Sequence, residues 1–244
     1  MKKNSIKFTL IILFVAYILL NGIKFNDGTI QVKEEEDTIK RFVDDFTYYG
    51  TGFVTMKADI FNDLTIVGDS YTNALDNDIG GDLITFSRSG FKVSLLHDNF
   101  LGAIKANKKY VVIFIGPNDF IAQTDLDEFK NILNQYISEV LAKTNSTIVL
   151  SSYLESIITV GCEEHNPKTF PNRIKQYDSK LREIVEEDET ERVLYFDIFN
   201  INDYEKYKRA EDDLLHFNAE FNCRYLVELH NFLKQYEDDL NTKK

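Results

Sequence analysis

Positively charged residues, cysteine and proline are all scarce in this chain of 244 residues. Lysine and arginine number 28 against 40 aspartates and glutamates, which gives a formal net charge of -12. Binding to nucleic-acid phosphates relies on clustered Lys and Arg, so this balance argues against a nucleic-acid partner. It also argues against broad docking onto an anionic membrane surface. With 43% apolar and 28% charged residues, no internal repeat and no low-complexity tract, the composition is that of a globular protein.

Only two cysteines are present, Cys162 and Cys223. They could form one disulfide in an oxidising compartment. Two buried free thiols are an equal alternative, because the sequence does not show whether the two residues meet. Cys162 also begins the run Cys-Glu-Glu-His that ends at His165, whose residue types can bind metals. No second cluster completes a ligand set, so we expect a substrate-facing or solvated loop there and no metal site.

One long apolar run interrupts the globular composition, at the N-terminus. Lys2 and Lys3 precede a nearly unbroken apolar stretch over Phe8–Leu20, and Ile6–Ile23 approaches the length of a transmembrane helix. A cleaved signal peptide is the alternative, although the small-residue cleavage pattern is missing. We therefore predict an uncleaved signal-anchor in residues 1–25, with the rest of the chain outside the cell membrane. Cleavage would instead yield a secreted protein.

Two further segments follow this anchor. Residues 26–60, which contain a short acidic run, are expected to form a stalk or lead-in. Over residues 61–244, helical patterns alternate with short, continuously apolar runs rich in β-branched residues, which are typical of strands covered on both faces. The strands are expected at Leu64–Val67, Leu83–Phe86, Tyr110–Ile115, Thr147–Ser151 and Val193–Phe196, and the helices at Asp125–Lys143, Asn172–Glu187 and about Ala219–Tyr236.

This alternation predicts parallel βαβ units, and therefore one three-layer α/β/α domain around a five-stranded parallel sheet. In such sheets ligands bind outside the carboxyl ends of the strands, near the switch in strand order. The loops that follow the strands are consequently the place to look for a site.

Polar residues that can carry out acyl transfer lie in these loops. The reaction needs a nucleophile, a base, a group that orients the base, and hydrogen-bond donors for an oxyanion. Ser70 is the candidate nucleophile, although a helix cap is the alternative reading of its position. His216 is the candidate base, and Asp213 in the same turn could orient its imidazole. The oxyanion candidates are the backbone amides of Ser70 and Gly90, where glycine permits close approach, and the side-chain amide of Asn118.

Four sequence blocks resemble those of the SGNH (GDSL-type) hydrolases. They occur in the family's order at predicted strand ends, over roughly residues 64–229: Gly68-Asp69-Ser70, Gly90, Gly116-Pro117-Asn118-Asp119 and Asp213-Leu214-Leu215-His216. The resemblance implies a flavodoxin-like fold and a serine esterase without a metal or other cofactor. It further implies nucleophile, base and orienter roles for Ser70, His216 and Asp213, and oxyanion-hole roles for Gly90 and Asn118.

Two positions depart from the family pattern. Tyr71 stands in place of the leucine of the GDSL signature, and Leu214 stands where many members have glycine. Neither change removes a reacting group, so we expect them to bear on substrate rather than mechanism, Tyr71 first. Asp119 is expected to cap the following helix, and His97 and His230 to be surface or packing residues.

The export signal and the site together predict a membrane-anchored, extracytoplasmic serine esterase. Its expected substrates are O-acyl groups, O-acetyl above all, on a cell-envelope or environmental glycan, by analogy with exported family members. An O-acyltransferase that modifies an envelope polysaccharide is an alternative, because hydrolysis and transfer share the acyl-enzyme. A catalytically silent, anchored glycan-binding protein is a second alternative, and lipid acyl chains remain possible substrates. The sequence indicates no oligomeric state.

Overall fold

The computed structural model describes residues 24–26, 29–31, 46–49, 53–56, 62–80, 83–115, 118–152, 170–198, 208–210 and 213–242. The chain divides into two compact units, Met1–Lys57 and Ala58–Lys244. The apolar run of the expected signal-anchor lies outside the described residues. Within those that are described, no helix combines the length and the apolar character needed to span a membrane.

The first unit contains four short strands, which the sequence did not predict. They are β1 (Lys24–Asn26), β2 (Thr29–Gln31), β3 (Phe46–Tyr49) and β4 (Phe53–Met56). Consecutive strands pair antiparallel, and β3 and β4 form a regular ladder from Phe46 opposite Met56 to Tyr49 opposite Phe53. Each strand has only three or four residues, which is too short for a periodic pattern to be recognised.

The second unit is built on a parallel sheet of five strands in the order β10-β9-β8-β5-β7. All five predicted strands are confirmed to within one residue at each end: β5 (Leu64–Gly68), β7 (Ile84–Ser87), β8 (Tyr110–Phe114), β9 (Thr147–Ser151) and β10 (Val193–Phe196). The first strand of the sheet lies between the second and third, which is the flavodoxin-like order. Every residue of β5 and β8 is buried, as expected for strands that are covered on both faces.

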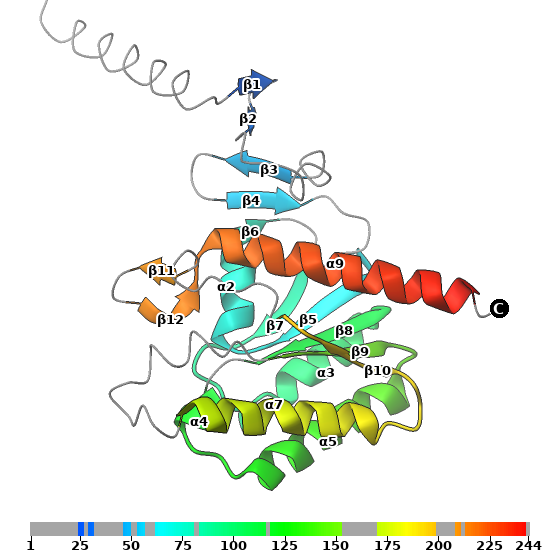
Figure 1. The fold of residues 1–244 in the computed structure, drawn as a ribbon. Coiled ribbons are helices and arrows are strands. Elements are labelled where there is room, and N and C mark those ends of the chain that lie inside the picture. The colour runs from blue at the N-terminus through cyan, green and yellow to red at the C-terminus, as the bar shows by residue number, and fades with distance from the viewer. Residues whose placement is uncertain are drawn as a thin grey trace, which may run out of the picture. The chain divides into compact units, whose positions relative to one another are not determined.

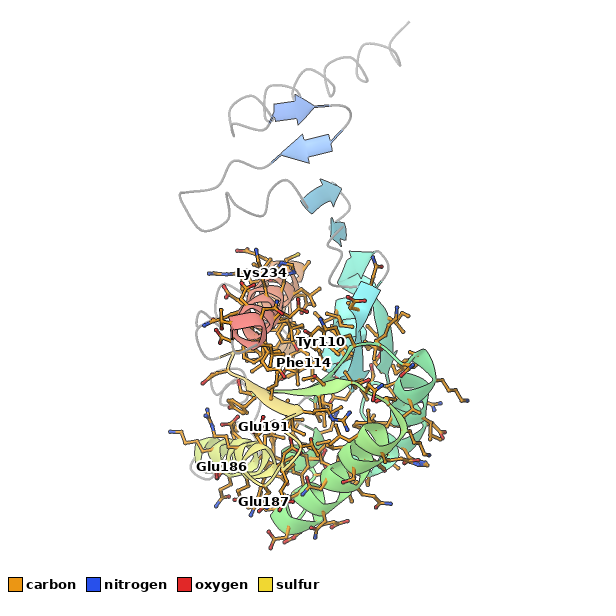
Figure 2. The ribbon with its side chains drawn as sticks, turned by 90° about the vertical axis from the view of Figure 1, so that its right-hand side faces the viewer. Tyr110, Phe114, Glu186, Glu187, Glu191 and Lys234 are labelled. Carbon is orange, nitrogen blue, oxygen red and sulfur yellow. The ribbon has the colours of Figure 1, made fainter. Side chains whose placement is uncertain are left out.

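Helices cover both faces of this sheet and complete the three layers (Figure 1). One face carries α3 (His97–Ala106), α5 (Leu126–Lys143) and α7 (Phe170–Glu186), and the other carries α2 (Ser70–Asp78) and α9 (Ala219–Thr242). The side chains of Tyr110 and Phe114 project from β8 toward α9 (Figure 2). There the Phe114 ring stacks on Tyr225 with centroids 4.4 Å apart, and the Tyr110 hydroxyl donates to Glu237 at 2.6 Å.

Several smaller elements were not expected from the sequence. They are β6 (Ile79–Gly80), the 3-10 turn η3 (Val93–Leu95), α4 (Asn118–Ile121), and the antiparallel pair β11 (Lys208–Ala210) and β12 (Asp213–Phe217). Strand β12 contains two predicted catalytic residues, Asp213 and His216, which the sequence predicts to lie in a loop.

Candidate active site

The carboxyl ends of three neighbouring strands lie in one row. Gly68 of β5 is in register with Ser87 of β7 on one side and with Phe114 of β8 on the other. Ser70 and Asn118 closely follow two of these ends, so the sheet brings them to the same edge, and Gly90 follows the third end. This edge is the switch point of the strand order, where doubly wound sheets bind their ligands.

Ser70 is the first residue of α2, and its neighbour Asp69 caps that helix. The Asp69 side chain is fully buried, and its Oδ1 accepts a hydrogen bond from the Tyr71 backbone N–H at 3.1 Å. The Asp69 carbonyl accepts from the Asn73 N–H at 3.0 Å, which closes the first helical turn. Asp69 therefore does the capping that was the alternative reading of Ser70. The half-buried Ser70 sits where the helix N-terminus presents its backbone N–H groups.

The second oxygen of Asp69 joins two of the predicted blocks. Asp69 Oδ2 accepts from the side-chain amide of Asn118 at 2.7 Å, and the same Asn118 nitrogen donates to the Phe91 carbonyl at 3.2 Å. The carboxylate thus ties the end of β5 to the residues after β8, and Phe91 adds the loop after β7. The sequence alone did not predict that Asp69 orients Asn118. Its position directly before Ser70 was the feature that could have indicated such a role.

These bonds engage both hydrogens of the Asn118 amide. Donation to a substrate oxyanion therefore requires Asn118 to give up one of its present acceptors. The bond to the Phe91 carbonyl is the longer of the two and involves no charge, so it is the weaker one.

Glycine is required at position 68 for close packing. A Cβ there would lie 1.9 Å from the Phe114 carbonyl oxygen and 2.2 Å from the Thr72 hydroxyl oxygen. The Thr72 hydroxyl donates to that same carbonyl at 2.8 Å. The absence of a side chain lets the start of α2 bind directly to the end of β8, which fixes the position of Ser70.

Glycine at position 90 is explained by its backbone conformation. Its φ angle is +76°, in the left-handed region, and a Cβ there would meet no atom within 4 Å. The residue is exposed in a turn in which the Phe91 N–H donates to the Arg88 carbonyl at 3.3 Å. Backbone conformation, rather than crowding, therefore explains the glycine.

His216 lies beside Tyr71, the residue next to Ser70. The two rings meet edge to face, with centroids 6.2 Å apart and planes at 80°. Tyr71 is only 3% exposed and also packs against Phe114 and Phe217, at 5.5 and 5.2 Å between centroids. The fold thus brings the candidate base to the start of α2. The ring of Tyr71 is buried in an aromatic cluster, and the expected bearing of this residue on the substrate stays a prediction.

Asp213 and His216 do not share a turn, contrary to expectation, because both belong to β12. Asp213 pairs with Ala210 of β11, and the register is irregular between that pair and the pair of Phe217 with Lys208. In an extended strand the backbone rises about 3.3 Å per residue, so positions three apart lie about 10 Å apart. The predicted hydrogen bond from the imidazole of His216 to the carboxylate of Asp213 stays a prediction.

Asp119 does not act as a helix cap. Its Oδ2 accepts from the Val93 N–H at 2.8 Å, which holds η3 against α4, and the carboxylate of Asp125 caps α5 instead. Burial raises the pKa of Asp119 above the ordinary aspartate value. His97 is confirmed as a surface residue, with Nε2 3.5 Å from the Glu139 carboxylate.

Part of the expected site lies outside the described residues. This applies to Gly116 and Pro117 and to residues 153–169, which include the run from Cys162 to His165. The possible disulfide between Cys162 and Cys223 therefore stays a prediction. Across the described parts of the chain, no group of three or more His, Cys, Asp or Glu residues could hold a metal ion.

Several solved structures share this fold. The psychrotrophic esterase EstA from Pseudoalteromonas sp. superimposes with a TM-score of 0.55 at 18% identity, over 72% of this chain and 99% of its own. An acetyl xylan esterase, AlAXEase, gives 0.52 at 16% identity, over 69% and 98%. A putative acylhydrolase from Bacteroides fragilis gives 0.52 at 15% identity, over 72% and 86%. At these identities the likeness establishes the fold.

Sequence comparison identifies the family. None of the curated proteins is detectably similar to this chain. The profile of the GDSL-like lipase/acylhydrolase family matches residues 57–222, which is more than half of the chain. The fold and the resemblance predicted from the sequence are both confirmed. The chain belongs to the GDSL-like lipase/acylhydrolase family and is an SGNH-type serine hydrolase.

Proposed function

We propose that this chain is an extracytoplasmic serine esterase that removes O-acyl groups, O-acetyl above all, from a glycan. The observation that supports the proposal is that both neighbours of Ser70 contact the other candidate residues: Asn118 donates to Asp69, and the ring of His216 lies against Tyr71. Family membership supports ester hydrolysis, and the similarity of fold to an acetyl xylan esterase supports an acetylated glycan as the substrate class.

In the proposed reaction, Ser70 Oγ attacks the ester carbonyl carbon while the imidazole of His216 takes the hydroxyl proton. The charge that develops on the carbonyl oxygen is met by the backbone N–H groups of Ser70 and Gly90 and by Asn118. His216 then returns the proton to the departing sugar oxygen, which leaves an acyl-enzyme. Water, activated by His216, attacks the acyl-enzyme and releases the carboxylic acid. Asp213 keeps, on the family resemblance alone, the predicted part of holding the imidazole in the productive tautomer.

Asn118 would change partners during this reaction. It would exchange its 3.2 Å hydrogen bond to the Phe91 carbonyl for one to the negatively charged oxyanion. Its shorter bond to the buried Asp69 carboxylate would persist and keep the amide oriented. The gain on moving from a neutral to a charged acceptor arises only in the transition state, which is where binding energy speeds a reaction.

The position outside the membrane is proposed on the sequence of residues 1–25. A signal-anchor there would tether the domain that begins near residue 61, with residues 26–60 as the lead-in. Protease treatment of intact cells checks this placement. Degradation of the membrane-bound protein without lysis supports it, whereas protection until lysis contradicts it.

Acetate release by the purified full-length protein in detergent tests the esterase. Acetylated xylan and 4-nitrophenyl acetate are suitable substrates, compared between the natural protein and Ser70→Ala. Ser138→Ala is a matched control, since Ser138 is an exposed serine on α5. We expect Ser70→Ala to lose activity by a factor on the order of a thousand or more, and Ser138→Ala to retain it. Equal rates for Ser70→Ala and the natural protein contradict the serine mechanism.

A further inference from the structure

Arg88 is an exposed residue whose backbone is bound to the strand end that precedes the proposed nucleophile. It directly follows β7, and its backbone N–H donates to the carbonyl of Gly68 at 3.2 Å, two residues before Ser70. Its own carbonyl accepts from Phe91, which closes the turn that contains Gly90. Arg88 is therefore carried on the same turn as a proposed oxyanion donor.

Both the turn and the side chain of Arg88 are oriented. The guanidinium carbon lies 5.0 Å from the centroid of the Phe91 ring, within cation–π range. The carbonyl of Phe91 in turn accepts from Asn118. The backbone of Arg88 is thus fixed against Gly68, and its guanidinium packs on Phe91, the residue whose carbonyl binds Asn118.

Arg88 has no ion-pair partner among the described carboxylates, although acidic residues outnumber basic ones 40 to 28. Two other arginines are engaged within the protein. Arg182 pairs with Asp178 at 3.1 Å, and Arg192 donates to the Leu141 carbonyl at 2.7 Å. The guanidinium of Arg88 consequently keeps its planar set of donors available, and this set matches the two oxygens of a carboxylate or phosphate.

We propose that Arg88 selects acylated substrates that carry a negative charge close to the ester. The proposal rests on the esterase function above and specifies its substrate class: an O-acylated compound with a carboxylate or a phosphate near the ester. A net charge of -12 repels such substrates at long range, so a cation at the site is what permits their productive binding. For a neutral ester Arg88 would offer no comparable contact.

Three aryl acetates with matched geometry test this inference: 4-acetoxybenzoate, 4-acetoxybenzamide and 4-acetoxyphenyl phosphate. The measured quantity is kcat/KM for each anion divided by kcat/KM for the amide, so that any general loss of activity cancels. We expect Arg88→Gln to lower this ratio about three- to tenfold, given the usual strength of an exposed to partly shielded charge pair. Arg88→Lys keeps the charge but loses the planar guanidinium, so its ratio should lie between those of the natural protein and Arg88→Gln.

Lys105→Gln is the matched control, because it removes one exposed positive charge on α3. Its ratio should equal that of the natural protein, and 0.5 M NaCl should lower the natural ratio by screening. A fall in Arg88→Gln for only one anion supports the inference and shows whether carboxylate or phosphate is preferred. An unchanged ratio for both anions, or an equal fall in Lys105→Gln, overturns it. If the natural protein hydrolyses none of the three esters, the proposed esterase function itself has failed.

Discussion

The buried carboxylate of Asp69 is the residue on which the geometry of the site depends most. One oxygen caps the helix that begins with Ser70, and the other holds the amide of Asn118. Since these two partners belong to different blocks of the sequence, a single side chain sets the distance between the proposed nucleophile and an oxyanion donor.

Replacement of Asp69 by asparagine should damage both stability and activity. Asparagine has one acceptor oxygen for two donors, so either the Tyr71 N–H or the Asn118 amide faces an NH2 group. We expect the free energy of unfolding in urea to fall by about 1–3 kcal/mol, the usual cost of a buried unsatisfied group. The kcat/KM on 4-nitrophenyl acetate should fall with it. Asp98→Asn, at an exposed position on α3, is the control, and equal behaviour of the two variants would contradict the role of Asp69.

The two glycines of the site should respond differently to alanine. Gly68→Ala places a methyl group against the backbone of β8, and the overpacking should cost about 1–3 kcal/mol of unfolding free energy and displace Ser70. Gly90→Ala meets open space and should cost only about 1–2 kcal/mol for the left-handed backbone. Urea unfolding of both variants, with kcat measured in parallel, checks that Gly68→Ala is the more damaging change. Larger losses of unfolding free energy and of kcat in Gly90→Ala than in Gly68→Ala would contradict this expectation.

The aromatic contact between Tyr71 and His216 gives a third residue-level expectation. Tyr71→Phe keeps the ring against the imidazole, whereas Tyr71→Leu restores the residue of the GDSL signature but removes the ring. Aromatic pairs contribute about 0.5–1.5 kcal/mol, so kcat should fall roughly two- to tenfold in Tyr71→Leu and much less in Tyr71→Phe. Equal kcat values for the two variants would show that the ring does not position His216.

Helix α4 and the turn η3 are held together by one buried hydrogen bond. The carboxylate of Asp119 accepts from the Val93 N–H, and η3 follows directly on the turn of Arg88 and Gly90. Burial raises the pKa of Asp119 in the folded state, so the folded protein binds this proton more tightly than the unfolded chain does.

A pH dependence with a definite sign follows for Asp119. The contribution of Asp119 to stability is fully present below the unfolded aspartate pKa and is lost as pH rises through the raised folded pKa. Asp119→Asn cannot ionise and keeps an acceptor for Val93. The free energy of unfolding of the natural protein should therefore fall relative to that of the variant as pH increases from about 4 toward neutrality. Urea titrations at several pH values measure the difference; a difference that is constant, or that changes in the opposite direction, contradicts the assignment.

Local sequence accounts for the main strands and helices but not for the small ones. The five strands of the parallel sheet are mainly apolar runs, and Asp125 marks the start of α5 by accepting from two backbone N–H groups at 3.0 Å. By contrast, β11 and β12 read as Lys-Arg-Ala and Asp-Leu-Leu-His-Phe, which show no clear strand pattern. Their pairing depends on contacts within the folded protein, and this is why Asp213 and His216 were placed in a turn.

The extent of α9 shows the same limit. Helix α9 continues to Thr242, beyond the predicted end near residue 236. Most residues of its last turns are polar and exposed. Glu237 accepts hydrogen bonds from Lys109 and Tyr110, which are distant from it in the sequence. Such a contact cannot be read from the local pattern of the helix.

The site as a whole was predictable because of the topology of the molecule. Parallel strands end at one edge, so Ser70, Gly90 and Asn118 could be assigned to the same place from their positions after strands. Asp69 was missed as a positioning residue because its partner Asn118 lies 49 residues away in the chain. No local pattern distinguishes a carboxylate that caps a helix from one that also orients a distant amide.

The charge of the whole molecule bears on its choice of substrate. Acidic residues outnumber basic ones by 12, and three glutamates, Glu186, Glu187 and Glu191, lie around the end of α7 (Figure 2). A protein of this charge should associate slowly with anionic substrates at low ionic strength, unless a cation at the site compensates locally. Arg88 is therefore proposed to offset, at the site, the repulsion that the net negative charge of the whole protein exerts on anionic substrates.

Covalent labelling of the full-length protein tests directly whether Ser70 is the activated nucleophile. Incubation with a fluorophosphonate probe, followed by digestion and mass spectrometry, locates the modified residue. We expect one adduct, on Ser70, with acetate release lost in proportion to labelling and no adduct in Ser70→Ala. An adduct on a different residue, or undiminished acetate release by fully labelled protein, would contradict it.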